Sequence, residues 1–206
     1  MAGKKLSDIT VGVLALQGDF REHRHALELL GAKTIEVKTA DQLRSVDALV
    51  IPGGESTTIS KLLRIFDLFD LLKSLIEAGL PVYGSCAGMI MLATTITDPA
   101  SGQECLGAIN IDVKRNAFGR QVDSFESDLT IAGIEGEPMR AVFIRAPWVE
   151  SAGSEVKVLA SVTLGGAEHH VAVQQGKALA TSFHPELTGD LRIHRYFLES
   201  VVGVEI

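Results

Sequence analysis

One of the two cysteines in this chain lies in the stretch Gly84-Ser85-Cys86-Ala87-Gly88, with an apolar run on either side. The spacing G-x-C-x-G between a strand and a helix is the cysteine form of the nucleophile elbow, a sharp turn that strains the backbone and needs small neighbours. The following helix directs its positive N-terminal end at the sulfur, which favours the thiolate. A buried free cysteine beside helix-packing glycines is the alternative for this motif alone.

A thiolate nucleophile needs a base, and His184 is the best placed of the six histidines. It opens a His-Pro-Glu motif directly after the apolar stretch 177–183. Pro185 biases His184 toward an extended backbone, in which residues i and i+2 face the same side. We therefore expect the Glu186 carboxylate to lie beside the imidazole and to hold its tautomer. A chance glutamate near a loop histidine is the alternative, but the elbow and this motif together favour a Cys-His-Glu triad.

The other five histidines offer weaker candidates. On the helix expected over 19–31, His25 points to solvent, whereas His23 falls toward the apolar face and is expected to pack at its edge. His169 and His170 are adjacent on an expected strand, so they point to opposite faces and make a poor metal pair. His194 lies between two arginines of the last helix and is expected at the surface.

A Gly-Gly turn follows the expected third strand, in the sequence Gly53-Gly54-Glu55. Acyl chemistry needs hydrogen-bond donors for the oxyanion, and two glycines let backbone N–H groups approach a substrate closely. A simple strand-to-helix turn is compatible with this role. The sequence contains no Walker motif, no G-x-G-x-x-G after a strand and no Cys/His zinc spacing. Because the thiol supplies the nucleophile, we expect neither a metal nor an organic cofactor.

The first half of the chain alternates between strand-like and helix-like segments. β-branched apolar runs indicate strands, and apolar residues that recur every three or four positions, such as Phe20, Leu27 and Leu30, indicate helices. This alternation favours a parallel sheet with helices on both faces. We expect strands over residues 9–18, 33–38, 47–54 and 80–84, and helices over 19–31, near 40–46, 55–79 and 87–96.

The second half consists of short strand-like segments separated by turns, which predicts antiparallel pieces. These segments cover residues 107–115, 139–147, 156–162, 169–175 and 177–183, and a final helix covers 190–202. The sequence shows no internal repeat and no linker, so we expect residues 1–206 to form a single domain. The predicted fold class is α/β: a three-layer, flavodoxin-like, mostly parallel sheet with helices on both faces and antiparallel strands in its second half.

Composition limits the possible partners. A net charge of −7 and the absence of basic runs argue against a nucleic-acid-binding protein, because phosphate binding needs clustered Lys and Arg. Two cysteines cannot form a disulfide framework, which favours a reducing cytoplasm. Residues 78–97 carry no charge, but Pro81 and three glycines interrupt them, so a strand, a turn and a buried helix explain the stretch better than a membrane span.

Together, the elbow, the downstream His-x-Glu and the upstream Gly-Gly resemble the triad-type (class I) glutamine amidotransferases. Four further stretches narrow the resemblance to the glutaminase subunits of pyridoxal 5′-phosphate synthases: LALQGDFREH, IPGGESTT, RNAFGRQVDSFE and FIRAP. The resemblance runs from about Val11 to Phe197, almost the whole chain, and its motifs occur in the same order.

The resemblance implies a role for each matching residue. Cys86 would attack the glutamine amide to form a glutamyl thioester. His184 would activate the thiol and protonate the departing ammonia, with Glu186 orienting the imidazole. Backbone N–H groups of Gly54 and Ala87 would form the oxyanion hole. The residues that would bind glutamine are Gly53, Gly54, Glu55, Arg115, Ile144 and Arg145. A cationic group near the α-carboxylate of the substrate makes physical sense.

The resemblance also implies a partner. Ammonia would pass to a separate synthase subunit, a (β/α)₈ barrel in a hetero-oligomeric complex that builds pyridoxal 5′-phosphate, an activity of vitamin B6 biosynthesis. The segment Thr97 to Cys105 is the part least like the family, and Cys105 in it is expected to be incidental. Two alternatives remain: a cysteine hydrolase or chaperone of the DJ-1/PfpI type, many of which carry histidine where this chain has Ala87, and a catalytically inactive regulatory subunit.

Overall fold

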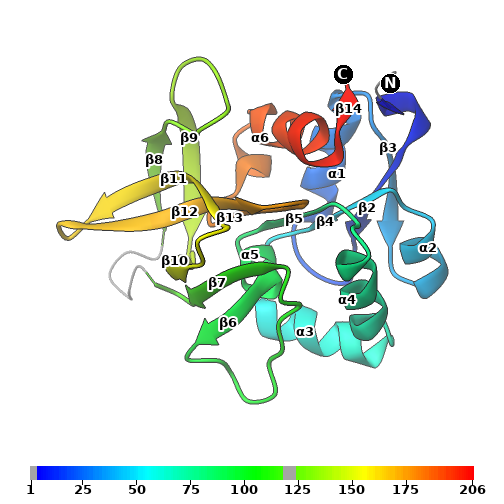
Figure 1. The fold of residues 1–206 in the computed structure, drawn as a ribbon, viewed down its shortest axis with the longest axis horizontal. Helices are drawn as coiled ribbons and strands as arrows, with labels where there is room; N and C mark the ends of the chain where they lie inside the picture. Colours follow the sequence, from blue (N-terminus) through cyan, green and yellow to red (C-terminus); the bar gives the residue numbers. More distant parts are fainter. Residues whose placement is uncertain (1–3, 118–123) are drawn as a thin grey trace.

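The centre of the molecule is a ten-stranded sheet, seen in a computed structural model that describes residues 4–117 and 124–206 (Figure 1). Its strand order is β3-β2-β4-β5-β13-β12-β10-β7-β6, and β11 pairs with β12 beside this path. The strands are β2 (Thr10–Leu14), β3 (Lys33–Val37), β4 (Ala48–Ile51), β5 (Val82–Ser85), β6 (Ala93–Thr97), β7 (Ile109–Lys114), β10 (Trp148–Ala152), β11 (Lys157–Leu164), β12 (Ala167–Gln175) and β13 (Ala178–Thr181).

Five neighbouring strands, from β3 to β13, run parallel. Helices connect the first four of them, as parallel pairing requires a crossover. The helices of the chain are α1 (Phe20–Leu29), α2 (Ala40–Arg44), α3 (Ser56–Ile65), α4 (Phe69–Glu77), α5 (Ala87–Leu92) and α6 (Arg192–Tyr196). Over the described residues, none of these helices is both long enough and apolar enough to span a membrane.

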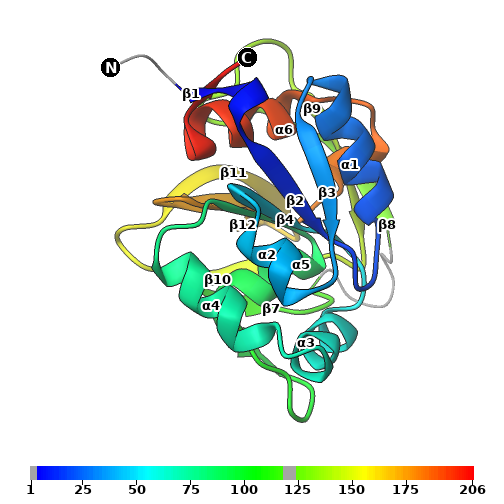
Figure 2. The same ribbon diagram turned by 90° about the vertical axis from the view of Figure 1, so that its right-hand side faces the viewer.

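The sheet separates two hydrophobic cores, which makes three layers. Along β4, Ala48 and Val50 belong to the core beneath α1 and α6, whereas Leu49 and Ile51 belong to the core beneath α2, α3 and α4. This alternation follows from the period-two geometry of a strand, and both faces are apolar because helices cover both (Figures 1 and 2). The expected three-layer α/β fold is confirmed.

Most of the second half of the sheet is antiparallel, as its short segments predicted, but its edge strand β6 runs parallel to β7. β12 runs antiparallel to β13, β11 and β10, and β10 runs antiparallel to β7. β13 itself lies parallel to β5, so it joins the two halves. Two smaller pairings stand apart, the antiparallel pair β8 (Ser124–Leu129) with β9 (Met139–Ile144) and the parallel pair β1 (Lys4–Lys5) with β14 (Val204–Glu205).

Three expected helices differ in extent. The helix predicted over 55–79 is two helices, because the chain leaves α3 through Asp67, whose φ is +54°. The helix expected over 87–96 ends at Leu92, and β6 follows without a gap because Ala93 to Thr97 pair with β7. In the last helix, α6 continues as a π-helix over Phe197–Val202 and ends at Gly203 in the left-handed conformation. Tertiary pairing and local caps, which apolar periodicity does not report, set these boundaries.

Two glycines allow α5 to lie against the sheet. A Cβ placed on Gly88 would be 2.3 Å from the Ile51 carbonyl oxygen, and one on Gly84 would be 2.5 Å from the backbone of Gly88. Each of these separations is shorter than any van der Waals contact. The N-terminus of α5 can therefore approach the ends of β4 and β5 only because both positions lack a side chain.

Gly88→Ala should destabilise the fold. The forced separation of α5 from β4 should cost about 1–3 kcal/mol, more than the ~1 kcal/mol by which alanine improves on glycine inside a helix. Urea denaturation followed by circular dichroism measures the difference. Lys73→Ala, at an exposed position of α4, is the control and should change the free energy of unfolding by less than about 0.5 kcal/mol. A Gly88→Ala variant as stable as the parent chain would show that α5 can shift freely.

Candidate active site

Cys86 occupies a strained turn between β5 and α5. Its φ is +48° and its ψ is −101°, a conformation that non-glycine residues rarely adopt. Its backbone N–H donates to the Thr181 carbonyl at 2.7 Å, and its carbonyl accepts from Met89 and Ile90 as α5 begins. The sulfur lies 3.9 Å from the Ile144 carbonyl oxygen. The geometry is that of a nucleophile elbow, with the sulfur at the N-terminal end of a helix.

The ends of three adjacent parallel strands meet at this site. Strands β4, β5 and β13 are neighbours in the sheet, and the chain leaves them toward Gly53, Cys86 and His184 respectively. The carboxyl ends of parallel strands lie at one edge, so segments far apart in sequence converge there. This topology brings together the elbow, the Gly-Gly turn and the His-Pro-Glu motif.

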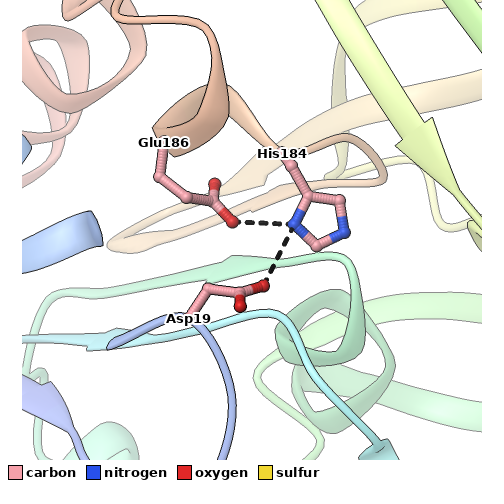
Figure 3. A group of neighbouring side chains, drawn as sticks. All are labelled: Asp19, His184 and Glu186. Carbon is pink, nitrogen blue, oxygen red and sulfur yellow. Dashed lines mark hydrogen bonds and ion pairs between the residues drawn. The ribbon is translucent and has the colours of Figure 1, made fainter. Parts of the chain in front are cut away.

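His184 and Glu186 are in direct contact. His184 Nδ1 lies 2.7 Å from Glu186 Oε1, and the other ring nitrogen points away from the carboxylate (Figure 3). The expected contact is present, but the backbone reason for it was wrong. His184 has φ −106° and ψ 85°, and Pro185–Leu187 form a single 3₁₀ turn instead of an extended segment. The turn folds the glutamate back toward the imidazole.

The surroundings of His184 favour its charged form. Burial by itself lowers the pKa of this imidazole, but contacts with Cys86 on one side and Glu186 on the other outweigh burial and raise the pKa to about 10. Burial raises the pKa of the Glu186 carboxyl, although the hydrogen bond with His184 acts in the opposite direction. An imidazolium between a sulfur and a carboxylate can stabilise a thiolate and later release a proton.

Asp19, which sequence reasoning did not single out, adds a second carboxylate. Its Oδ2 lies 3.7 Å from His184 Nδ1, on the side of the ring that also faces Glu186 (Figure 3). Asp19, His184 and Glu186 are residue types that ligate metals, and their ligand atoms lie within 4.8 Å of one another. The 2.7 Å between Nδ1 and Oε1 is a hydrogen bond, however, and a metal bonded to both atoms at ~2.0–2.2 Å would have to push them apart. The arrangement fits a shared proton.

The Gly-Gly turn packs against both the imidazole and the first helix. A Cβ on Gly53 would lie 2.4 Å from His184 Cε1, so only glycine leaves room for the ring. The Gly53 carbonyl accepts from the Asp19 N–H at 3.2 Å, and the Glu55 N–H donates to the Gln17 side chain at 2.8 Å. These two bonds tie the Gly-Gly turn to the segment that precedes α1.

A small cavity opens beside the sulfur. Its volume is about 40 Å³, and its wall is formed by described residues of α3, α5 and β9 and of the turns beside them, together with the two residues that follow β7. The lining residues are Gly54, Glu55, Ser56, Cys86, Ala87, Ile90, Arg115, Asn116, Ile144 and Arg145. Six residues predicted to bind substrate therefore fall into two groups: five line this cavity, and Gly53 lies behind it against His184. Part of the RNAFGRQVDSFE motif, residues 118–123, lies outside the described residues.

Arg115 is held by two partners, one of them unforeseen. Its guanidinium donates to Glu55 Oε1 at 3.4 Å and to Gln103 Oε1 at 2.9 Å. Gln103 in turn donates to the Ser56 hydroxyl at 2.9 Å. Gln103 belongs to the segment from Thr97 to Cys105, whose role the sequence left open. That segment therefore packs on the start of α3 and fixes a wall of the cavity.

Two histidines lie deeper than the sequence indicated. His194 was expected at the surface and His23 at the edge of a helix face, yet both are fully buried; His25 is exposed, as expected. The prediction for His194 was wrong because it relied on the two flanking arginines and not on the spacing of His194 from the apolar residues of the same helix. His194, Phe197, Leu198 and Val201 follow the i, i+3, i+4, i+7 spacing of a buried stripe, and all four are buried.

Comparisons with known proteins agree with this geometry. The model of the SNO glutamine amidotransferase family matches residues 13–203. The chain is 59% identical to proteins named pyridoxal 5′-phosphate synthase subunit PdxT from Acidothermus cellulolyticus, over 94% of both chains, and from Rhodococcus opacus, over 94% of this chain and 98% of that one. A solved structure titled "Crystal structure of glutamine amidotransferase" is 51% identical, with a TM-score of 0.85 over 94% of this chain and 99% of the other.

The two cysteines should differ in reactivity. Burial, together with the neighbouring Glu104, raises the pKa of Cys105 to about 11, so only about a thousandth of it is thiolate at pH 8. Iodoacetamide at pH 8 should therefore modify Cys86 much faster than Cys105, and a rise to pH 9 should accelerate modification of Cys105 about tenfold. Mass mapping of the alkylated peptides gives both rates, with denatured chain as the control in which both react. Equal rates in the folded protein would contradict the buried environment of Cys105.

Proposed function

Because the chain belongs to the SNO glutamine amidotransferase family, we propose that it hydrolyses L-glutamine to L-glutamate and ammonia and supplies the ammonia to a synthase subunit that makes pyridoxal 5′-phosphate. One observation carries the catalytic part: Cys86 lies on a left-handed turn at the start of α5, with an imidazole paired to a buried carboxylate beside it. The similarity to PdxT proteins supports the synthase partner and favours neither a DJ-1/PfpI-type protein nor an inactive subunit. The whole chain would act as one glutaminase domain, in the cytoplasm.

The first half of the reaction uses all three residues of the proposed triad. The Cys86 sulfur bonds to the side-chain amide carbon of glutamine, and the carbonyl oxygen becomes an oxyanion. Backbone N–H groups of Gly54 and Ala87 are the proposed donors to that oxygen. The His184 imidazolium gives its proton to the amide nitrogen, the C–N bond breaks, and ammonia leaves behind a glutamyl thioester.

The second half regenerates the thiolate. His184, now neutral, takes a proton from a water molecule whose oxygen bonds to the thioester carbon. The C–S bond then breaks, L-glutamate leaves, and the imidazolium again faces the thiolate. Glu186 holds Nδ1–H throughout, which keeps Nε2 directed at the sulfur and stabilises each imidazolium state.

The cavity wall supplies the recognition of glutamine. Arg115 is the proposed partner of the α-carboxylate, because Glu55 and Gln103 hold its planar guanidinium toward the cavity. Glu55, Ile144 and Arg145 complete the wall together with the Gly-Gly turn. A volume of about 40 Å³ holds only a few water molecules.

Cys86→Ala should abolish glutamine hydrolysis, because loss of the nucleophile in a triad enzyme costs orders of magnitude in rate. The fold should survive, since the elbow tolerates a small side chain. Cys105→Ala is the matched control and should keep the parent activity. Glutamate release and circular dichroism, measured on both variants with the synthase present, test the proposal. A folded Cys86→Ala variant with near-parent activity would refute the assignment of the nucleophile.

We propose that the synthase partner, a (β/α)₈ barrel, controls the oxyanion hole. The Gly53–Gly54 peptide can reorient at low steric cost because both residues are glycine. Among the backbone hydrogen bonds of the described residues, its carbonyl accepts only the 3.2 Å bond from the Asp19 N–H. Each oxyanion donor is worth roughly 10²–10³ in rate. A peptide that reorients when the partner docks would therefore act as a switch, and it would prevent release of ammonia into bulk water.

The isolated chain should accordingly show weak glutaminase activity, and kcat should rise by roughly 10² or more when purified synthase is titrated in at saturating glutamine. Glutamate release is measured at each concentration of synthase. Asp19→Ala is the control, because it keeps the backbone N–H that bonds to Gly53. The ratio of its kcat with synthase to its kcat without synthase should resemble that of the parent. Full activity of the isolated chain, unchanged by the synthase, would refute the coupling and leave the triad assignment intact.

A further inference from the structure

A chain of buried polar side chains lies behind Glu186, on the side away from the cavity. His23 from α1, Ser85 from β5 and His194 from α6 have no exposed surface, and neither does the Glu186 side chain. His23 Nδ1 lies 2.9 Å from His194 Nε2, and His23 Nε2 lies 2.8 Å from the Ser85 hydroxyl. Burial of so many polar groups is costly unless each finds a partner.

The chain ends at the carboxylate oxygen that His184 does not use. Glu186 Oε1 is bonded to His184, whereas Oε2 lies 3.3 Å from His23 Nε2 and makes no hydrogen bond with any described residue. A buried carboxylate oxygen without a donor is unfavourable, so the approach of a ring nitrogen has a direct electrostatic consequence. His23 therefore faces Glu186 from the side opposite His184.

The charge on Glu186 selects one tautomer for both histidines. Burial lowers the pKa of His23 well below its usual value and that of His194 to about 4, so each ring is neutral and carries one N–H. With that hydrogen on Nε2, His23 donates to the Ser85 hydroxyl and accepts at Nδ1 from His194 Nε2–H. The same positive N–H edge of His23 faces Glu186 Oε2 without a hydrogen bond to it. In the opposite tautomer a lone pair of His23 would face the carboxylate at 3.3 Å. Only the first arrangement directs the N–H groups of both histidines along the chain toward Glu186.

This tautomer also explains why one ring nitrogen has no hydrogen-bond partner among the described residues. His194 Nδ1 is buried and has no hydrogen-bond partner among the described residues. With the hydrogen on Nε2, Nδ1 carries a lone pair and no N–H. A buried acceptor without a partner is less costly than a buried donor. The network is thus consistent in one direction, from His194 through His23 to Glu186.

We propose that His23, supported by His194, is a positioning residue of the glutaminase: the positive Nε2–H edge of its ring lies 3.3 Å from Glu186 Oε2 and attracts the carboxylate, so that Oε1 stays on His184 Nδ1. The inference rests on the proposed function. His23 touches neither substrate nor the reacting atoms, and it acts only through Glu186. Its removal should lower kcat and leave KM unchanged, because neither His23 nor His194 nor Glu186 lines the cavity.

The test is a double-mutant cycle measured with saturating synthase. His23→Leu removes the donor and should lower kcat about tenfold, with KM within about twofold of the parent value. His23→Gln retains a side-chain N–H and should recover most of that loss. In a Glu186→Gln background, which should keep a detectable residual activity, His23→Leu should have no further effect. His25→Leu, on the exposed side of the same helix, is the matched control and should leave kcat unchanged.

An equal loss in both backgrounds would overturn the inference, because His23 would then act on the fold and not through Glu186. If His23→Leu does not fold, His194→Leu gives the same cycle and should lower kcat about threefold in the parent background alone. Alkylation of Cys86 by iodoacetamide is a readout that needs no glutamine. His23→Leu should slow it in the parent background and should not slow it further in the Glu186→Gln background. A parent chain inactive on glutamine would contradict the proposed function, while the alkylation cycle would still decide the role of His23.

Discussion

At Cys86 the chain passes from β5 into α5 with a φ of +48°, a conformation that costs a non-glycine residue of order 1–3 kcal/mol. The surrounding structure stabilises this turn through the 2.7 Å bond from the Cys86 N–H to Thr181 and through the first turn of α5. The close approach at Gly84 and Gly88 leaves no room for the turn to relax. The sulfur is therefore presented at one point in space, and every other part of the site is arranged relative to it.

The parallel order of β4, β5 and β13 supplies that arrangement. Because the three strands are neighbours and point the same way, the loops that follow them share one edge of the sheet. The opposite wall comes from Arg115, after β7 in the antiparallel half of the sheet, and from Ile144, at the end of β9 in the separate β8–β9 pair. The proposed nucleophile and base thus follow strands of the parallel half, whereas the cavity that would admit a substrate lies between these strand ends and the segments after β7 and β9.

The electrostatics of the site depend on burial at Glu186. A carboxylate without exposed surface interacts strongly with its few neighbours, because little water screens it. On one side it raises the pKa of His184, and on the other it selects the tautomer of His23. The same low polarity that makes an unpaired carboxylate costly makes a correctly paired one effective in orienting the imidazole.

The sequence by itself determined the order and type of most elements, and it supplied the candidate site residues. G-x-C-x-G, His-Pro-Glu and Gly-Gly are local patterns, and the alternation of apolar segments predicted a parallel sheet with helices on both faces. At the His-Pro-Glu motif the structure differs only in the backbone, which forms a 3₁₀ turn and not an extended segment. Only the tertiary structure decided how distant segments meet: that Gln103 reaches Arg115, and that His23 and His194 form a chain behind the proposed triad. These contacts join residues up to 171 positions apart. Local propensity and periodicity report only on near neighbours, so no pattern in the sequence could pair them.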